Sequence, residues 1–175
     1  MIPPADLGTY IEHQGRPAVR FVRTYPHSIE RVWSAITEPD QLRAWFPSAV
    51  TIEPRVGGII TFTFDPHTDD STGTVLEWEP PHRLAYSWEG DELHYELEAV
   101  DDGQCRLTFI NVLHELDTAA RNGAGWTVCF AELDRLLAGT PADGPHGAAA
   151  LPWQPIYDAY VAAGVPSGAP IPSGS

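Results

Sequence analysis

Histidine and cysteine are the side chains that most often bind metals or serve as bases and nucleophiles, and this sequence has seven histidines and two cysteines. The histidines stand at positions 13, 27, 67, 82, 94, 114 and 146, with no i, i+4 pair and no cysteine partner at the spacing of a metal site. The sequence therefore predicts no metal site, and nothing in it calls for an organic cofactor.

One adjacent pair of residues could supply an acid and a base. His114 and Glu115 stand just before the last long predicted helix, where they could face the mouth of a cavity. A loop histidine beside a glutamate is more often simply solvated. The sequence has no Gly-x-Ser-x-Gly elbow, and neither Cys105 nor Cys129 has an obvious base beside it. We assign no catalytic residues and favour a role without catalysis.

Charge and composition exclude several partners. The net charge is -14, the pI is near 4.6, and all ten basic residues are arginine, a bias typical of GC-rich bacterial genomes. Such a surface repels nucleic acid and anionic membranes, and the absence of lysine excludes Schiff-base chemistry and a P-loop. There is no apolar membrane span and no recognisable signal peptide, and two isolated cysteines fit a reducing compartment. We expect a cytoplasmic protein.

The middle of the chain alternates apolar and polar residues with a period of two, which is the pattern of strands with one buried face. Six such segments, joined by Gly-, Pro- or Asp-rich turns, predict an antiparallel meander over residues 49–53, 59–64, 72–78, 83–88, 92–99 and 105–112. The inward positions include Ile60, Phe62 and Phe64; Leu84, Tyr86 and Trp88; and Leu93, Tyr95 and Leu97. The inner face of the predicted sheet is therefore rich in aromatic side chains.

A hairpin and helices flank the meander. Residues 8–25 predict an N-terminal hairpin, and Ser28 begins a helix that is followed by a second short helix over residues 39–45. After the meander, Asp117 can cap a long helix that ends near Gly139. Glycines at positions 123 and 125 are expected to weaken the first half of this helix.

The C-terminal part of the chain has a different amino-acid composition from the part before it. We divide the chain into a domain of residues 1–138 and a Gly-, Pro- and Ala-rich extension of residues 139–175, which holds a short predicted helix over residues 153–164. This helix would expose a large apolar patch if nothing covered it. It therefore packs either on the body of the same chain or against a second copy in a homodimer, and the sequence leaves both open.

Several short motifs together resemble one protein family. They are VWSAITEP at residues 32–39 with Leu42 and Trp45-Phe46, Gly57-Gly58 before an alternating strand, Gly73-x-Val75, Leu84-x-Tyr86-x-Trp88, and Gly125-Trp126 in the last long helix. Over roughly residues 18–138, the chain is similar to the activator of heat-shock protein 90 ATPase homologue-like branch of the START-like (SRPBCC, Bet v 1-like) superfamily. These are packing and turn residues, so the resemblance implies a fold and assigns no catalytic residue.

The resemblance implies an α+β helix-grip fold, in which a curved antiparallel sheet wraps around a long C-terminal helix and two short helices follow the first long strand. Such a fold can enclose an apolar cavity. We expect the cavity to be lined by inward-facing aromatic residues and one amide: Phe62, Phe64, Tyr86, Trp88, Tyr95, Phe109, Asn111, Trp126 and Phe130. Aromatic residues at this spacing also serve simply as core.

Two polar residues share the inward parity. Asn111 follows the parity of Phe109, so its amide needs a partner, which could be a ligand, a backbone carbonyl or water. Glu77 would also point inward if its strand is regular, although a solvated carboxylate is the more common case.

Three functions follow from these expectations. The leading hypothesis is a protein that binds a small apolar or aromatic ligand. The second is a protein-interaction module that acts on a chaperone ATPase, as the resemblance implies. The third is an enzyme of the cyclase or hydrolase type that uses Asn111, Glu77 or Tyr95 in the same cavity.

Overall fold

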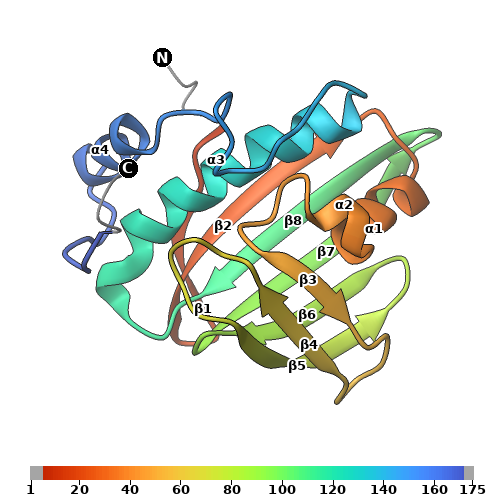
Figure 1. Cartoon of the computed structure of the whole chain (residues 1–175), viewed down its shortest axis with the longest axis horizontal. Coiled ribbons are helices and arrows are strands. Elements are labelled where there is room, and N and C mark those ends of the chain that lie inside the picture. Colours follow the sequence, from red (N-terminus) through yellow and green to blue (C-terminus); the bar gives the residue numbers. More distant parts are fainter. Residues whose placement is uncertain (1–5, 172–175) are drawn as a thin grey trace.

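The computed structural model describes residues 6–171 and contains one eight-stranded antiparallel sheet with four α-helices (Figure 1). The strands are β1 (Thr9–His13), β2 (Arg16–Tyr25), β3 (Ala49–Ile52), β4 (Ile59–Thr63), β5 (Ser71–Glu79), β6 (Arg83–Trp88), β7 (Asp91–Asp101) and β8 (Gln104–Val112). The helices are α1 (Ile29–Thr37), α2 (Pro39–Leu42), α3 (Ala119–Leu137) and α4 (Trp153–Ala162).

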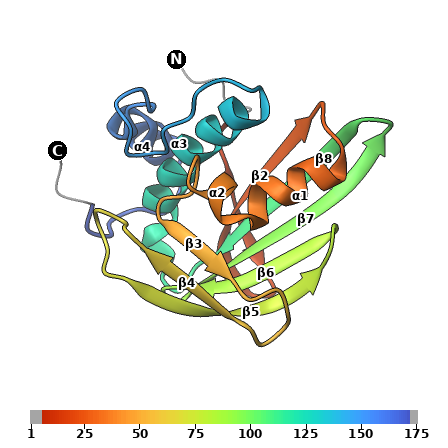
Figure 2. The ribbon, with the colours of Figure 1, turned by 45° about the vertical axis from the view of Figure 1, so that its right-hand side comes forward.

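The sheet has the strand order β1-β2-β8-β7-β6-β5-β4-β3. Consecutive strands pair from β3 to β8, as the meander predicts, and β2 joins the last of them, so the first and last long strands lie side by side. The sheet curves around α3, and α1 and α2 occupy the rest of the hollow (Figure 2). This is the predicted α+β helix-grip fold.

The inner face of the sheet follows much of the alternation predicted from sequence, but β5 interrupts it. Val75 pairs with Tyr86 and both face inward, but a bulge between Val75 and Glu77 shifts the register. Glu77 then pairs with Ala85 on the outer face, and Trp78 takes the inward position. Because the strand is not regular, Glu77 does not take the inward position considered for it and lies on the outer face, in line with the more common case.

The first helices cover one end of the hollow. The Ser28 side chain accepts a hydrogen bond of 3.2 Å from the backbone N–H of Arg31, as predicted for an N-cap. The second helix is shorter than predicted, because it ends at Leu42 and turns follow. Those turns place Trp45 in the core, where its indole N–H donates to the Ala35 carbonyl over 2.9 Å.

The long helix is continuous through both of its glycines. A short 3-10 turn (Leu116–Thr118) precedes α3, so Asp117 lies in that turn and Thr118 is the N-cap. Beyond the other end, Gly139 has a φ of 76°, the left-handed conformation that commonly follows a helix.

The fourth helix packs on α3 of the same chain, on the side away from β3 and β4 (Figure 1). Its buried residues are Ile156 and Tyr160, and the Tyr160 hydroxyl lies 2.7 Å from the Thr127 hydroxyl of α3. Gly123 permits this approach, because a Cβ at that position would lie 2.9 Å from the Tyr160 ring. The apolar face of α4 is therefore covered within the chain.

Candidate functional site

The aromatic residues predicted to line a cavity mostly contact one another. Phe109 lies at the centre of the cluster, with ring centroids 4.9 Å from Trp126, 5.0 Å from Tyr95 and 5.1 Å from Phe130. Phe46, which the sequence analysis did not select, packs 5.5 Å from Trp126. The middle of the space between the sheet and α3 is thus filled by the protein's own rings.

Two residues of the predicted lining lie outside this packed centre. Phe64 is 85% exposed, because β4 ends at Thr63 and the chain turns away with a φ of 62° at Phe64. Its predicted inward position is wrong. Trp88 is half-buried at the end of β6, with its ring centroid 5.2 Å from that of Trp126.

Two tyrosine hydroxyls meet within the apolar cluster. The Tyr86 and Tyr95 oxygens lie 2.7 Å apart, so each satisfies the other. Burial raises the pKa of both phenols well above the usual value. Both hydroxyls are therefore neutral at physiological pH, and neither has an ionised base beside it. Glu77 lies on the other face of the sheet from Tyr95 and Asn111, so the three residues of the enzyme hypothesis do not converge.

A buried polar network connects the aromatic cluster to the surface near the start of α3. Asn111 is fully buried, and its amide oxygen accepts hydrogen bonds from the Trp126 indole N–H at 3.0 Å and the Asn122 amide at 3.1 Å. Its amide nitrogen donates to Asp91 over 2.9 Å. The prediction that this side chain is internal is confirmed. Its partners are mainly side chains of β7 and α3, which were not among the partners considered from the sequence, together with the Val112 carbonyl at 3.4 Å.

Asp91 is the acidic end of this network. One carboxylate oxygen accepts from Asn111 and Asn122, and the other accepts from the backbone N–H of His114 over 2.8 Å. Asp91 is only 8% exposed, and burial raises the pKa of its carboxyl above the usual value, although the hydrogen bonds from Asn111 and from the His114 backbone act in the opposite direction. The site thus holds a carboxyl that takes up a proton more readily than a free aspartate does.

A pocket of about 260 Å³ opens above the network, and we call it the mouth pocket. Strand ends and loops from three parts of the chain surround it: the β6–β7 turn, the segment after β8 with the start of α3, and the C-terminal tail. Its lining residues are Trp88, Glu89, Asp91, His114, Glu115, Thr118, Arg121, Asn122, Ala169 and Pro170. Of the predicted lining, only Trp88 reaches this pocket directly, while Asn111 and Trp126 lie beneath it in the network.

The C-terminal tail forms one wall of the mouth pocket. The backbone N–H of Ala120 donates to the Pro166 carbonyl over 2.9 Å, and the Ala169 N–H donates to the Asp117 carbonyl over 3.3 Å. The Arg121 guanidinium donates to the Pro170 carbonyl over 3.1 Å. These hydrogen bonds hold the tail against the start of α3, where it borders the opening of the mouth pocket.

The rim of the mouth pocket carries titratable groups. His114 and Glu115 both lie there, at the mouth position considered for them from the sequence. The Glu89 carboxyl has its pKa raised, first by partial burial and then by the nearby negative charge of Asp65. The rim can therefore donate and accept hydrogen bonds while Trp88 offers an aromatic surface.

Asp91 and Asn122 are the members of the polar network that the sequence analysis missed. Asp91 directly follows Gly90, and a Gly-Asp pair between two strands is typical of a turn, so the sequence does not mark it as a site residue. Asn122 had one usable signal, because it lies four residues before Trp126 and shares its face of the helix.

Residues 6–171 show neither a cluster of metal ligands nor a membrane-spanning helix. Within residues 6–171, no group of three or more His, Cys, Asp or Glu side chains is placed to hold a metal ion. None of the helices described for these residues is both long and apolar enough to cross a membrane.

Solved structures with the same fold come from several bacteria. The conserved protein EF2215 from Enterococcus faecalis aligns with a TM-score of 0.72 at 21% identity, covering 89% of each chain. The crystal structure of CalU16 from Micromonospora echinospora gives 0.63 at 22% identity, covering 84% of this chain and 87% of that one. The Aha1 dimer from Colwellia psychrerythraea gives 0.58 at 23% identity, covering 69% of this chain and 95% of that one.

These identities establish the fold alone, and a search of curated proteins gives no match. The family described as Activator of Hsp90 ATPase homolog 1-like protein matches residues 26–138, from the start of α1 to the end of α3. That match covers more than half of the sequence and includes the sheet from β3 to β8. The chain belongs to the Activator of Hsp90 ATPase homolog 1-like family.

Proposed function

We propose that this protein binds a small ligand with an apolar or aromatic body in the mouth pocket. The observation that carries the proposal is one pocket in which an aromatic wall, Trp88, stands over a buried amide and carboxylate network. Ligand sites in proteins combine these two features, since the apolar wall supplies affinity and a few fixed polar groups supply orientation.

The geometry constrains the size and position of the ligand. A volume of about 260 Å³ is just below the usual range for ligand sites, about 300–1,000 Å³, so we expect a small molecule. The ring cluster around Phe109 fills the space below. The ligand therefore sits over Trp88 and Asn122 at the start of α3 and does not lie deep between the sheet and the helix.

Titration with an environment-sensitive naphthalene dye tests the proposal. We expect saturable binding that a metal chelator does not change, because no metal takes part. The variant Trp88→Asp should weaken binding at least about tenfold, since it replaces the aromatic wall with a charge. Trp153→Asp on α4, away from the mouth pocket, is the matched control and should bind like the wild type.

Two outcomes would contradict the proposal. One is no saturable binding by wild type whose circular dichroism shows it folded, and the other is equal binding by folded Trp88→Asp. Either result would favour the alternative that the family description suggests, a protein-interaction role in modulating a chaperone ATPase. Native mass spectrometry of freshly purified protein gives an independent readout, because a retained natural ligand would appear as an added small mass.

A further inference from the structure

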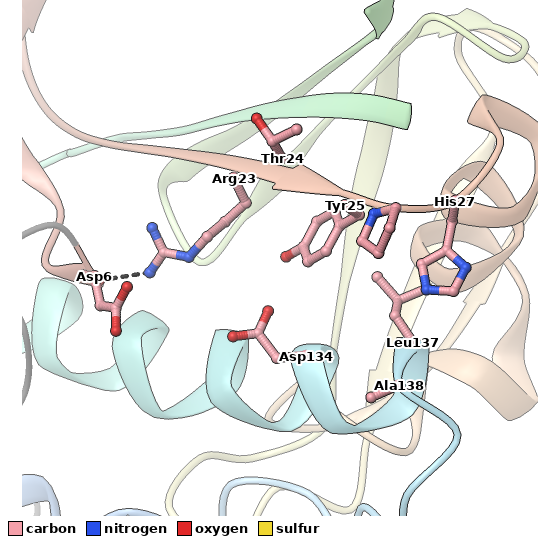
Figure 3. A pocket seen from close by; sticks show the side chains of 9 residues that line it. Asp6, Arg23, Thr24, Tyr25, His27, Asp134, Leu137 and Ala138 are labelled. Atoms are coloured by element: carbon pink, nitrogen blue, oxygen red, sulfur yellow. Dashed lines mark hydrogen bonds between the residues drawn. The ribbon is translucent and has the colours of Figure 1, made fainter. Parts of the chain in front are cut away.

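A second pocket, of about 300 Å³, lies at the opposite end of α3 from the mouth pocket (Figure 3). The end of β2, the segment leading into α1 and the last turns of α3 enclose it. Its lining residues include Arg23, Tyr25, Pro26, His27, Asp134 and Leu137. This C-terminal pocket shares no lining residue with the mouth pocket.

Tyr25 places an unpartnered hydroxyl at the floor of the C-terminal pocket. Its residue is 5% exposed, and the hydroxyl oxygen makes no hydrogen bond of normal geometry within the described residues. Figure 3 shows the hydroxyl pointing toward the Asp134 carboxyl across the pocket. A buried hydroxyl without a partner is unfavourable, so a ligand that satisfies it gains affinity.

Asp134 supplies a carboxylate that faces the Tyr25 hydroxyl. Within residues 6–171, this side chain takes part in no ion pair and accepts no hydrogen bond of normal geometry. Burial raises the pKa of its carboxyl, and the charge of Arg23 and the nearby Tyr25 hydroxyl lower it. The residue lies on the exposed side of α3, so its side chain can rotate to admit a group between itself and Tyr25.

The one arginine of the C-terminal pocket is already engaged. The Arg23 guanidinium donates to the backbone carbonyls of Val22 and Asp6, and it lies 5.6 Å from the Phe21 ring centroid. Figure 3 shows it turned toward Asp6 and away from Tyr25. The groups left open are therefore mainly hydrogen-bond acceptors, which favour a ligand that donates.

We propose that the C-terminal pocket binds a small primary ammonium compound, with its nitrogen between the Tyr25 hydroxyl and the Asp134 carboxylate. An ammonium has three N–H donors and a positive charge, so it can bond to both oxygens at once. Pro26 and Leu137 offer apolar surface for a short alkyl or aryl body. The sequence contains no lysine, so no side-chain ammonium of this chain competes for the position.

Benzylammonium, titrated at pH 7 and followed by calorimetry and amide NMR shifts, tests this proposal on the whole protein. We expect saturable binding with shifts centred on residues 23–27 and 134–138. Benzyl alcohol and benzoate have a similar shape without the positive charge, and we expect them not to bind there. The test is independent of the mouth pocket, where shifts would fall on residues 88–91 and 114–122 instead.

Two conservative variants locate the binding groups. Asp134→Asn keeps the shape and removes the charge, and should weaken benzylammonium at least about fivefold. Tyr25→Phe removes only the hydroxyl and should weaken benzylammonium binding about threefold with little change in the melting temperature, since the hydroxyl makes no hydrogen bond of normal geometry. Asp40→Asn, an exposed aspartate on α2, changes the net charge equally and should bind like the wild type.

Four results would overturn the proposal. One is no binding of benzylammonium by the folded wild type, and another is binding that Asp134→Asn leaves unchanged. The third is tighter binding of benzoate than of benzylammonium, which would make Arg23 the recognising group. A shift pattern confined to the mouth pocket would also overturn it while leaving the proposed function intact.

Discussion

At the scale of single residues, the polar end of the core depends on Asn111. Its amide oxygen is the acceptor for both Trp126 and Asn122, and its nitrogen donates to Asp91. A side chain that both accepts and donates is needed at this point, because an indole N–H and a carboxylate meet there. An apolar replacement would leave the buried Trp126 and Asp91 groups short of partners.

We therefore predict that Asn111→Leu lowers the free energy of unfolding by about 2–4 kcal/mol, the cost of leaving several buried polar groups unsatisfied. Urea denaturation gives the measurement. Asn122→Leu is the matched control, because Asn122 is half-buried and donates to Asp91 and Asn111, and we expect a loss of about 1 kcal/mol or less. Equal losses in the two variants would show that Asn111 does not hold the network together.

The sequence predicted the position of Asn111 in this network but not its hydrogen-bond partners. The period of two placed Asn111 inside, because the parity of a strand is a local property of the chain. Its partners were beyond reach, since Asp91 lies 20 residues away in sequence and Asn122 lies 11 residues away. Which long-range neighbours meet depends on the register of β7 with β8 and on how α3 crosses the sheet.

At the scale of elements, α3 carries two glycines with opposite roles. Gly123 lies beneath the Tyr160 ring of α4, and that ring is fixed by hydrogen bonds of its hydroxyl to Thr127 and to the backbone N–H of Gly8. Gly125 has open space where a Cβ would stand. The sequence analysis treated both as weak points of the helix. Their different roles become visible only once the position of α4 is known.

The pair makes a direct test of how α4 docks. Gly125→Ala should stabilise the protein by about 0.5–1 kcal/mol, because alanine favours the helix and meets no neighbour. Gly123→Ala should destabilise it despite the same gain in helix propensity, because the new Cβ would lie 2.9 Å from the Tyr160 ring. Thermal unfolding of both variants is sufficient. If both stabilise, α4 does not rest on Gly123 in solution.

The assignment of residues to the inner face differs from the structure where a strand is interrupted. The bulge in β5 moves Glu77 to the outer face, and the end of β4 leaves Phe64 in solvent. Both residues continue an alternating pattern, so nothing in the local sequence marks the interruption. Bulges and strand ends follow from how the sheet curves around α3, which is a property of the whole fold.

At the scale of the whole molecule, the space between the sheet and α3 is divided into three parts. The ring cluster around Phe109 fills the middle, the mouth pocket opens near the start of α3, and the C-terminal pocket opens near its end. Both pockets combine carboxylates with one arginine. The sequence predicted one central cavity, because parity shows which side chains point inward and not how closely they pack.

Two carboxyl groups, Asp134 and Glu92, make the stability of the protein depend on pH in opposite directions. Burial raises the pKa of Asp134, where Arg23 is the nearby cation and Asp6 a nearby anion. The pKa of Glu92 is lowered, chiefly by its hydrogen bond to His94 and further by the charge of Arg16. The net charge of -14 adds a general repulsion that both groups share.

The two shifts predict opposite changes in pH dependence. The folded state holds the Asp134 proton more tightly than the unfolded chain does, so its contribution is present below the unfolded pKa, about 3.9, and is lost as pH rises through the folded value. Glu92 behaves in reverse: its contribution is present above the unfolded pKa, about 4.3, and is lost as pH falls through the folded value.

Urea midpoints measured from pH 3 to pH 7 should therefore separate two variants that remove the same charge. Relative to wild type, Asp134→Asn should gain stability as pH rises through this range, because it lacks the group whose ionisation is unfavourable in the fold. Glu92→Gln should lose stability relative to wild type over the same range, because it lacks the carboxylate that His94 and Arg16 stabilise. General repulsion changes equally in both variants, so parallel curves would mean that it outweighs the local surroundings of these two carboxyls.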